Sequence, residues 1–299
     1  MRWVRDYKPQ PEVSRLYTTA LVITLGGNLL LAAVKIIAAA ISGSAALFAD
    51  AANSSSDVVY SLLMVLGLWV AQRPPDLSHP QGHKRFEPLV GLMVTLSMTL
   101  AGYLAIRNAV ERFIEGGSTF AIGFPLVVLL LAACVKVGMF LTIRRISARL
   151  SSPTLNTTAQ DNLSDVLTSA AAAVGTAGAA FLHPLADPIA GVLVSIWIFR
   201  AAFLAGRENL GFLTGAGASS ELREQIVALA EAVPGVQRVH HTMTDYAGPG
   251  LIVDLHINVN GEMTLNEAHR IADEVIGKLE ELPEVDRAYV HIEPHDWED

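Results

Sequence analysis

The sequence predicts an α-helical membrane bundle of six transmembrane helices, followed by a C-terminal cytoplasmic α+β domain with the element order αββαβ. Three observations lead to this prediction. Hydrophobic residues make up 52% of the 299 residues, a larger share than soluble domains usually have. Six apolar stretches are long enough to cross a bilayer. After about residue 210 the pattern becomes mixed and polar, as is typical of a soluble domain.

The six predicted spans follow one another with short connections. They cover residues 16–41, 45–71, 88–114, 122–143, 158–182 and 186–206. A helix rises about 1.5 Å per residue, so about 20 residues cross a hydrocarbon core about 30 Å thick. The first stretch lacks the small-residue cleavage site of a signal peptide, so we expect it to persist as a helix. The predicted divisions are an N-terminal segment 1–15, a membrane domain 16–208 and a soluble domain 209–299.

Lysine and arginine are distributed unevenly among the connections. They occur before the first span and in the second and fourth connections, whereas the other three connections contain none. By the positive-inside rule, both termini are cytoplasmic and the chain is a multi-pass protein of the cell (inner) membrane. The formal net charge is −8, and the acidic excess lies mainly in the tail. This charge argues against nucleic acid as a partner.

The tail alternates helical and strand patterns. Helices are predicted at 219–232 and 264–281, and strands at 236–246, 251–259 and 286–293. Residues 251–259 alternate apolar and polar side chains, as a strand with one buried face does. The order αββαβ predicts a small sandwich of helices on a sheet.

Two pairs of polar residues interrupt the second and fifth predicted spans. Asn53 and Asp57 are four positions apart, as are Asp161 and Asp165, so each pair projects from one face of its helix. Counting along two antiparallel helices brings both pairs to a similar depth. A carboxylate in hydrocarbon costs about 2.5 kcal/mol or more, so three of them predict a cation site. Interhelical hydrogen bonding is the alternative, and for Asn53 alone it is an equal one.

A smaller group of polar residues lies in the second connection. Asp76, His79 and His83 offer two imidazoles and a carboxylate to a divalent ion, although a capped turn before the third span explains them equally well. Lys136, in the fourth span, is interpreted as reaching the inner interface rather than as a counter-charge.

Histidines also recur in the tail. His256, His269 and His291 each lie on a regular element beside apolar neighbours. A shared metal site and separate surface positions are equally good interpretations of this pattern.

Three segments carry a family pattern. They are SGSAALFADAANSSSD at 42–57, HPQGH at 79–83 and QDNLSDV at 160–166. With six spans and an αββαβ tail, they resemble the cation diffusion facilitators, which are dimeric membrane exporters of divalent transition metals. The resemblance covers nearly the whole chain. It implies a homodimer in the lipid bilayer that exports metal without enzymatic activity.

The resemblance also implies three sets of metal ligands. The transport site corresponds to Asn53, Asp57, Asp161 and Asp165, and a loop site to Asp76, His79 and His83. A site in the soluble domain corresponds to His240, His256, His269, His291 and Glu293, where metal would link the packing of two such domains. No cofactor is expected, because the divalent metal is transported or regulatory.

The transport residues depart from those of the family's zinc exporters, which combine histidine with aspartate. No histidine occupies any of the four positions here. Oxygen ligands suit Mn2+, whereas imidazole favours Zn2+ and its neighbours. Crowded carboxylates repel one another without a cation, so protons are expected to replace the metal. The sequence therefore predicts a Mn2+/proton antiporter, with Fe2+, Zn2+ and Co2+ as alternative cargoes. A passive channel or receptor is the rival class, and no motif supports a metalloenzyme.

Overall fold

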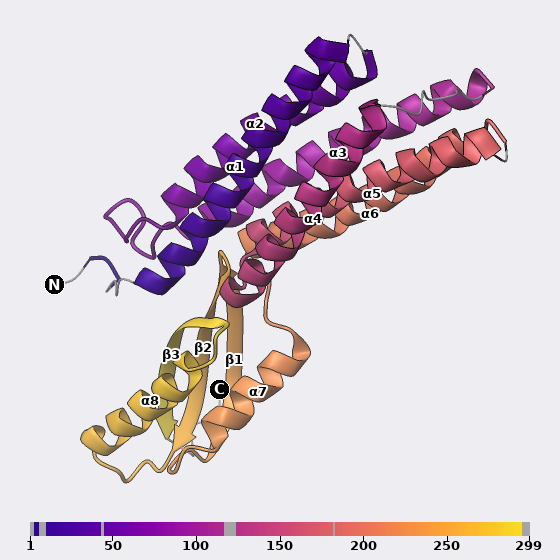
Figure 1. Cartoon of the computed structure of the whole chain (residues 1–299). Helices are drawn as coiled ribbons and strands as arrows, with labels where there is room; N and C mark the ends of the chain where they lie inside the picture. The colour runs from indigo at the N-terminus through magenta and orange to yellow at the C-terminus, as the bar shows by residue number, and fades with distance from the viewer. Residues whose placement is uncertain (1–2, 6–9, 43–44, 117–123, 182, 295–299) are drawn as a thin grey trace. The chain divides into compact units, whose positions relative to one another are not determined.

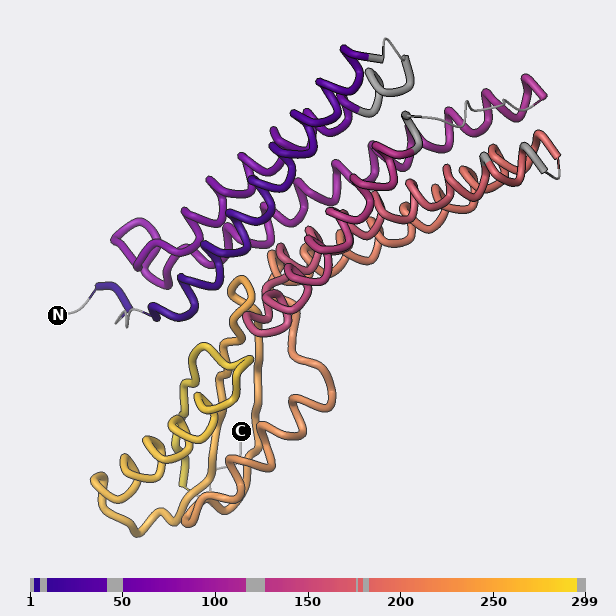
Figure 2. The backbone as a smooth tube through the Cα atoms, in the orientation of Figure 1, coloured from indigo at the N-terminus to yellow at the C-terminus, as the bar shows by residue number. Residues whose placement is uncertain are grey.

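The computed structural model describes residues 3–5, 10–42, 45–116, 124–181 and 183–294. The chain divides into two compact units, Met1–Asn209 and Leu210–Asp299. Figure 1 shows their helices and strands, and Figure 2 traces the backbone in the same view.

Long helices make up the first unit. They are α1 (Pro11–Ser42), α2 (Ala45–Ala71), α3 (Phe86–Ile114), α4 (Phe124–Leu150), α5 (Pro153–Phe181) and α6 (Ala186–Thr214). Each overlaps one of the predicted apolar stretches, and most continue beyond it. Helix α4, for example, runs on through Arg144 and Arg145 to Leu150. Apolar composition ends where the hydrocarbon ends, whereas backbone hydrogen bonding continues as long as the side chains permit a helix.

Five of these helices are long and apolar enough to cross a membrane, and α5 is not among them within the described part of the chain. Its first half is rich in threonine, asparagine and aspartate. Several of these side chains, including Thr157, Thr158 and Asn162, are buried. The low apolar content of α5 therefore reflects a polar surface that faces other helices. The membrane character of the unit is confirmed, but the count of six spans is not.

The helices lie lengthwise against one another (Figure 1). Helix α1 packs on α2 and α4, α2 packs on α3, and α5 packs on α3 and α4. Helices α3 and α6 also approach closely, because a side chain at Gly91 would overlap Asn209. This packing places α5 beside α3 and α4, where its polar residues are covered by neighbours.

A buried carboxylate, Glu87, joins three segments near one end of the first unit. The Tyr17 hydroxyl donates a hydrogen bond of 2.8 Å to Glu87 Oε2, and the Ser152 hydroxyl donates to the other carboxylate oxygen. A buried charge is tolerated when such donors surround it. Glu87 thereby ties α1 and the start of α5 to the start of α3.

The second unit contains the elements α7 (Ser220–Glu231), β1 (Arg238–Ala247), β2 (Gly250–Val259), α8 (Leu265–Glu280) and β3 (Val285–Pro294). The predicted αββαβ order is confirmed. The strands form a sheet in the order β1-β2-β3, with β1 antiparallel and β3 parallel to β2. Helices α7 and α8 pack against each other and against this sheet (Figure 1).

The two faces of the sheet differ in character. Leu251, Val253, Leu255 and Ile257 of β2 are buried in one core cluster with residues of α7 and α8. Because side chains alternate along a strand, the intervening residues, including His256, project to the opposite face. The capping box formed by Thr264 and Glu267 starts α8, which covers the apolar face only.

Candidate metal sites

Three aspartates of the first unit converge on a buried lysine. Lys136 Nζ, from α4, lies 3.1 Å from Asp57 Oδ2 of α2 and 2.6 Å from Asp165 Oδ2 of α5. The Lys136 side chain is only 5% exposed. The interpretation of Lys136 as an interfacial side chain is therefore wrong. Carboxylates of α2 and α5 hold its ammonium group inside the unit.

Asp161 joins this group from one helical turn before Asp165. Its charge interacts with those of Asp57, Asp165 and Lys136. A second buried lysine, Lys35 of α1, also interacts electrostatically with Asp57. Three carboxylates thus share their surroundings with two lysines, and the fully ionised group carries one net negative charge.

Asp57 and Asp161 also line a cavity together with several uncharged polar side chains. Its lining residues are Thr24 and Asn28 of α1; Asp57, Tyr60, Ser61 and Met64 of α2; Val94 and Ser97 of α3; and Thr158, Asp161 and Asn162 of α5. Oxygen atoms predominate among the polar groups. Such a lining can hold water or a hard cation.

Asn53 occupies a different position from the three aspartates. It lies one helical turn before Asp57 on α2, and its side chain is exposed. Among the described residues, no contact links it to Asp57, Asp161 or Asp165. The structure brings together three of the four residues expected at this site.

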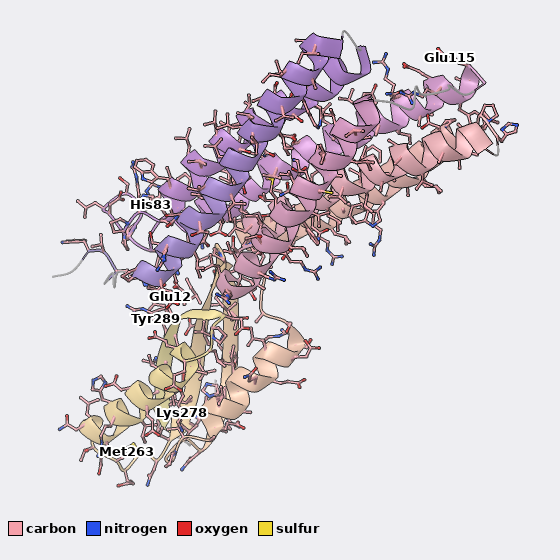
Figure 3. The ribbon with its side chains drawn as sticks, viewed as in Figure 1. Glu12, His83, Glu115, Met263, Lys278 and Tyr289 are labelled. Carbon is pink, nitrogen blue, oxygen red and sulfur yellow. The ribbon has the colours of Figure 1, made fainter. Side chains whose placement is uncertain are left out.

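The connection between α2 and α3 gathers Asp76, His79 and His83. His83 Nε2 lies 3.4 Å from Asp76 Oδ2, and His79 Nδ1 lies 3.6 Å from Asp76 Oδ1. One ligand atom from each residue lies within 4.8 Å of the others. His83 is found at the end of the first unit that also carries Glu12, away from Glu115 (Figure 3). This geometry suits one carboxylate and two imidazole ligands on a small cation.

Backbone donors organise this loop as well. The N–H groups of His79 and Ser78 both donate to Asp76 Oδ1, at 2.7 and 2.9 Å. The hydrogen bond from His79, followed by the one from Ser78 and the two nearby imidazoles, lowers the pKa of the Asp76 carboxyl. The loop is thus a turn capped by Asp76, and its three candidate ligands also lie close together, so the geometry is compatible with both sequence interpretations.

A second cluster lies on the sheet face opposite α8. Glu293 is surrounded by His240 Nε2 at 3.0 Å, His256 Nδ1 at 3.2 Å and His291 Nε2 at 3.4 Å. His256 and His291 are directly paired across β2 and β3. His240 lies at the irregularity in the β1–β2 pairing between Val239 and His241. Such a bulge redirects a side chain, and here it brings His240 toward Glu293.

His269 lies apart from this cluster. It is 74% exposed on α8, where it pairs with Asp273 at 3.5 Å. Helix α8 covers the apolar face of the sheet, whereas Glu293 and its histidines lie on the other face. The three-stranded sheet therefore separates His269 from the residues with which it was grouped.

The sequence interpretation missed several residues near the aspartates. Asn28 and Lys35 are polar positions within the long apolar run of α1, and both are buried. That contrast is the signal that could have identified them, because intramembrane polar residues generally face the interior of a bundle. Their partners on other helices are visible only in the folded unit.

Comparisons with known proteins agree across both units. Residues 21–214 match the family described as the cation efflux transmembrane domain, and residues 218–295 match the cation efflux protein cytoplasmic domain. An uncharacterized transporter of Methanocaldococcus jannaschii is 34% identical over 273 residues, covering 91% of this chain and 96% of that protein.

Two relatives have more specific names. The manganese efflux system protein MneS of Bacillus subtilis is 26% identical and covers 91% of this chain and 94% of its own length. The magnetosome protein MamM of Paramagnetospirillum magneticum is 30% identical, with 85% and 80% covered. A solved MamM-CTD structure is 30% identical, has a TM-score of 0.25 and covers 25% of this chain and 96% of that one. The chain belongs to the cation efflux family and is a divalent metal cation efflux transporter.

Proposed function

We propose that this transporter exports Mn2+ from the cytoplasm in exchange for protons. The metal binds Asp57, Asp161 and Asp165 in the first unit. The observation that carries the proposal is the convergence of these carboxylates from α2 and α5. Asp57 and Asp165 contact the same lysine, and Asp57 and Asp161 line a cavity whose described lining contains no histidine. Oxygen ligands favour Mn2+ relative to softer metals. The named manganese efflux relative supports the same cargo.

Asn53 is the fourth ligand of this proposal. Its side chain is exposed on α2, so its participation requires a rotation of that helix. Fe2+, Zn2+ and Co2+ are the alternative cargoes, because carboxylates bind all of these ions and differ in preference rather than in ability.

Lysine and metal compete for the same carboxylates in this mechanism. Lys136 contacts Asp57 and Asp165, and a divalent ion bound there repels its ammonium group. When the metal leaves, protons and the returning lysine restore charge balance. This exchange provides a physical basis for antiport, because metal and counter-charges cannot fully occupy the carboxylates together.

The remaining features complete the proposal. Helix α5 is the sixth span, both termini are cytoplasmic, and the protein works as a homodimer in the cell membrane. Asp76, His79 and His83 receive metal at the cytoplasmic end. His240, His256, His291 and Glu293 bind metal in the soluble domain and bias the transporter between its states. His269 belongs to this set only if a partner subunit brings it there.

Transport into proteoliposomes tests the proposal. Mn2+, Zn2+, Fe2+ and Co2+ are offered in turn, with a pH-sensitive dye on the opposite side. We expect Mn2+ uptake coupled to proton movement and its loss in Asp57→Ala. Glu111→Gln is the matched control, since Glu111 is an exposed acid that pairs with Arg107 on α3. Zinc transport without manganese transport contradicts the cargo, and uptake without proton movement indicates a passive channel.

A further inference from the structure

We propose that Asn28 of α1 supplies a neutral oxygen ligand to the cation held by Asp57 and Asp161. The inference rests on the proposed function, because it takes these carboxylates as the cargo site. It extends the ligand set to a third helix, whereas the sequence pointed only to α2 and α5.

A chain of hydrogen bonds fixes the orientation of the Asn28 amide. The Ser61 hydroxyl donates to the backbone carbonyl of Asp57 at 2.7 Å. Its one proton is thereby used, so Ser61 Oγ must accept from its other partner. That partner is Asn28 Nδ2, also at 2.7 Å. The amide nitrogen is therefore directed at Ser61, and the carbonyl oxygen is the group left for another partner.

The Asn28 oxygen is buried without a hydrogen bond. Asn28 is 5% exposed, and its Oδ1 has no hydrogen-bond partner among the described residues. Asn28 lines the same cavity as Asp57 and Asp161. Thr24, one turn earlier on α1, lines that cavity too, and its buried Oγ1 is likewise without a described partner. Buried polar atoms generally have partners, so two such oxygens at one cavity indicate a ligand there.

Helix packing explains the nitrogen end of the Asn28 amide but not its oxygen end. An asparagine that joined α1 to α2 would need the contact from Nδ2 to Ser61. The carbonyl oxygen, which that contact does not use, is the chemically suitable group for a hard cation. It adds coordination without adding negative charge, as suits a site that already contains the carboxylates of Asp57 and Asp161.

The cavity lining and the lysine that contacts Asp57 come from different helices. Lys136 comes from α4 and contacts Asp57 together with Asp165, whereas the cavity is lined by α1, α2, α3 and α5. A cation can therefore approach Asp57 and Asp161 through the cavity and meet the Asn28 oxygen there.

Metal binding to the purified full-length chain tests the inference. Affinities for Mn2+ and Zn2+ are measured by calorimetry for the wild type, Asn28→Leu, Asn28→Asp and Ser61→Ala. Asn28→Leu removes the oxygen at similar volume, and we expect Mn2+ affinity at this site to fall by about tenfold or more. Zn2+ affinity should fall less, so the Mn2+/Zn2+ ratio decreases. Asn28→Asp retains an oxygen and should recover Mn2+ binding.

The control separates a ligand from a structural contact. Ser61→Ala breaks the hydrogen bond that orients the amide but retains the Asn28 carbonyl oxygen, so it should lower the Mn2+/Zn2+ ratio less than Asn28→Leu does. An Asn28→Leu variant with an unchanged Mn2+/Zn2+ ratio overturns the inference, since the buried oxygen would then serve only water. If Asn28→Leu does not fold, Asn28→Ala is judged by the same ratio.

The proposed function has a separate outcome in this experiment. Asp57→Ala should abolish binding at the membrane site. If it binds Mn2+ as the wild type does, the proposed cargo site fails. If Asp57→Ala loses binding while Asn28→Leu keeps the wild-type ratio, only the role of Asn28 fails.

Discussion

Replacing Lys136 with methionine removes the ammonium group from between two carboxylates. Methionine retains most of the apolar stem, so the change concerns charge more than packing. Breaking a buried ion pair by removing one partner costs about 3–5 kcal/mol. Asp57 and Asp165 are 15% and 28% exposed, and water can reach them in part. We therefore expect a destabilisation of about 3 kcal/mol when no metal is present.

The melting temperature should reveal this loss. For a unit of about 200 residues, 1 kcal/mol corresponds to about 2–4 °C, so the expected decrease is about 6–12 °C. Thermal unfolding in detergent can be followed by the fluorescence of the four tryptophans. Mn2+ should reverse much of the decrease. At about 100 times its dissociation constant, a ligand stabilises the protein that it binds by about 2.7 kcal/mol.

Loss of the lysine should also tighten Mn2+ binding. Two unit charges about 4 Å apart interact by about 4 kcal/mol at an effective dielectric constant of about 20. The flexible lysine can move away from a bound ion, so only part of this energy is recovered. We expect about tenfold tighter binding, equivalent to about 1.4 kcal/mol.

Arg112→Met is the matched control. It breaks the ion pair of Arg112 with Asp187, at 2.8 Å, and lies about 22 Å along α3 from the cavity residue Ser97. It should lower the melting temperature without changing the Mn2+ response. Equal Mn2+-induced shifts in Lys136→Met and the wild type would refute the idea that this lysine competes with the metal. A decrease of less than about 2 °C in the melting temperature of metal-free Lys136→Met would also refute the reasoning.

Three further results are expected. Glu293→Gln should remove metal binding in the second unit, because Glu293 contacts His240, His256 and His291. Calorimetry should show no such loss for His269→Ala. Equal losses in the two variants would contradict the separation of His269 from the Glu293 cluster. The pKa of the Asp76 carboxyl is lowered, so its turn is fully stabilised above the ordinary pKa of about 3.9 and weakens as the pH falls through the lowered pKa. Hydrogen exchange of the His79 backbone amide should become faster at that low pH, whereas in Asp76→Ala it should be fast at every pH. Protection of this amide that acid does not change would contradict the assignment. Thr264→Ala should destabilise α8 by about 1 kcal/mol through loss of its N-terminal cap, which should appear as faster hydrogen exchange of the α8 amides. The control Thr214→Ala loses hydrogen bonds only within α6 and should leave exchange in α8 unchanged.

Periodicity and apolar length predicted most of the architecture. The stretch at 45–71 coincides with α2, and the alternation at 251–259 differs from β2 by one residue. These features are local, because a helix must satisfy its own hydrogen bonds in lipid and a half-buried strand must alternate. Helix α5 does not meet the apolar criterion, since several of its polar residues are buried against protein.

Spacing was a weaker guide to which candidate residues meet. Asp57, Asp161 and Asp165 converge as their four-residue spacing and matched depth suggested, and Asp76, His79 and His83 lie within one turn. Asn53 and His269 have equally suggestive positions in the sequence. One is exposed on α2, and the other is separated from its expected partners by the sheet. Spacing shows which residues share one face of a helix or strand, but it does not show which other helix or strand packs against that face.

The sequence by itself determined that this protein has an apolar, helical membrane unit with acidic residues inside it, because charge in an apolar span is expensive enough to be informative wherever the helices pack. Only the tertiary structure decided which side chains lie beside those carboxylates. It showed Lys136 between Asp57 and Asp165, and Asn28 beside the cavity that Asp57 and Asp161 share. These residues are far apart in the sequence, and only helix packing determines whether they meet.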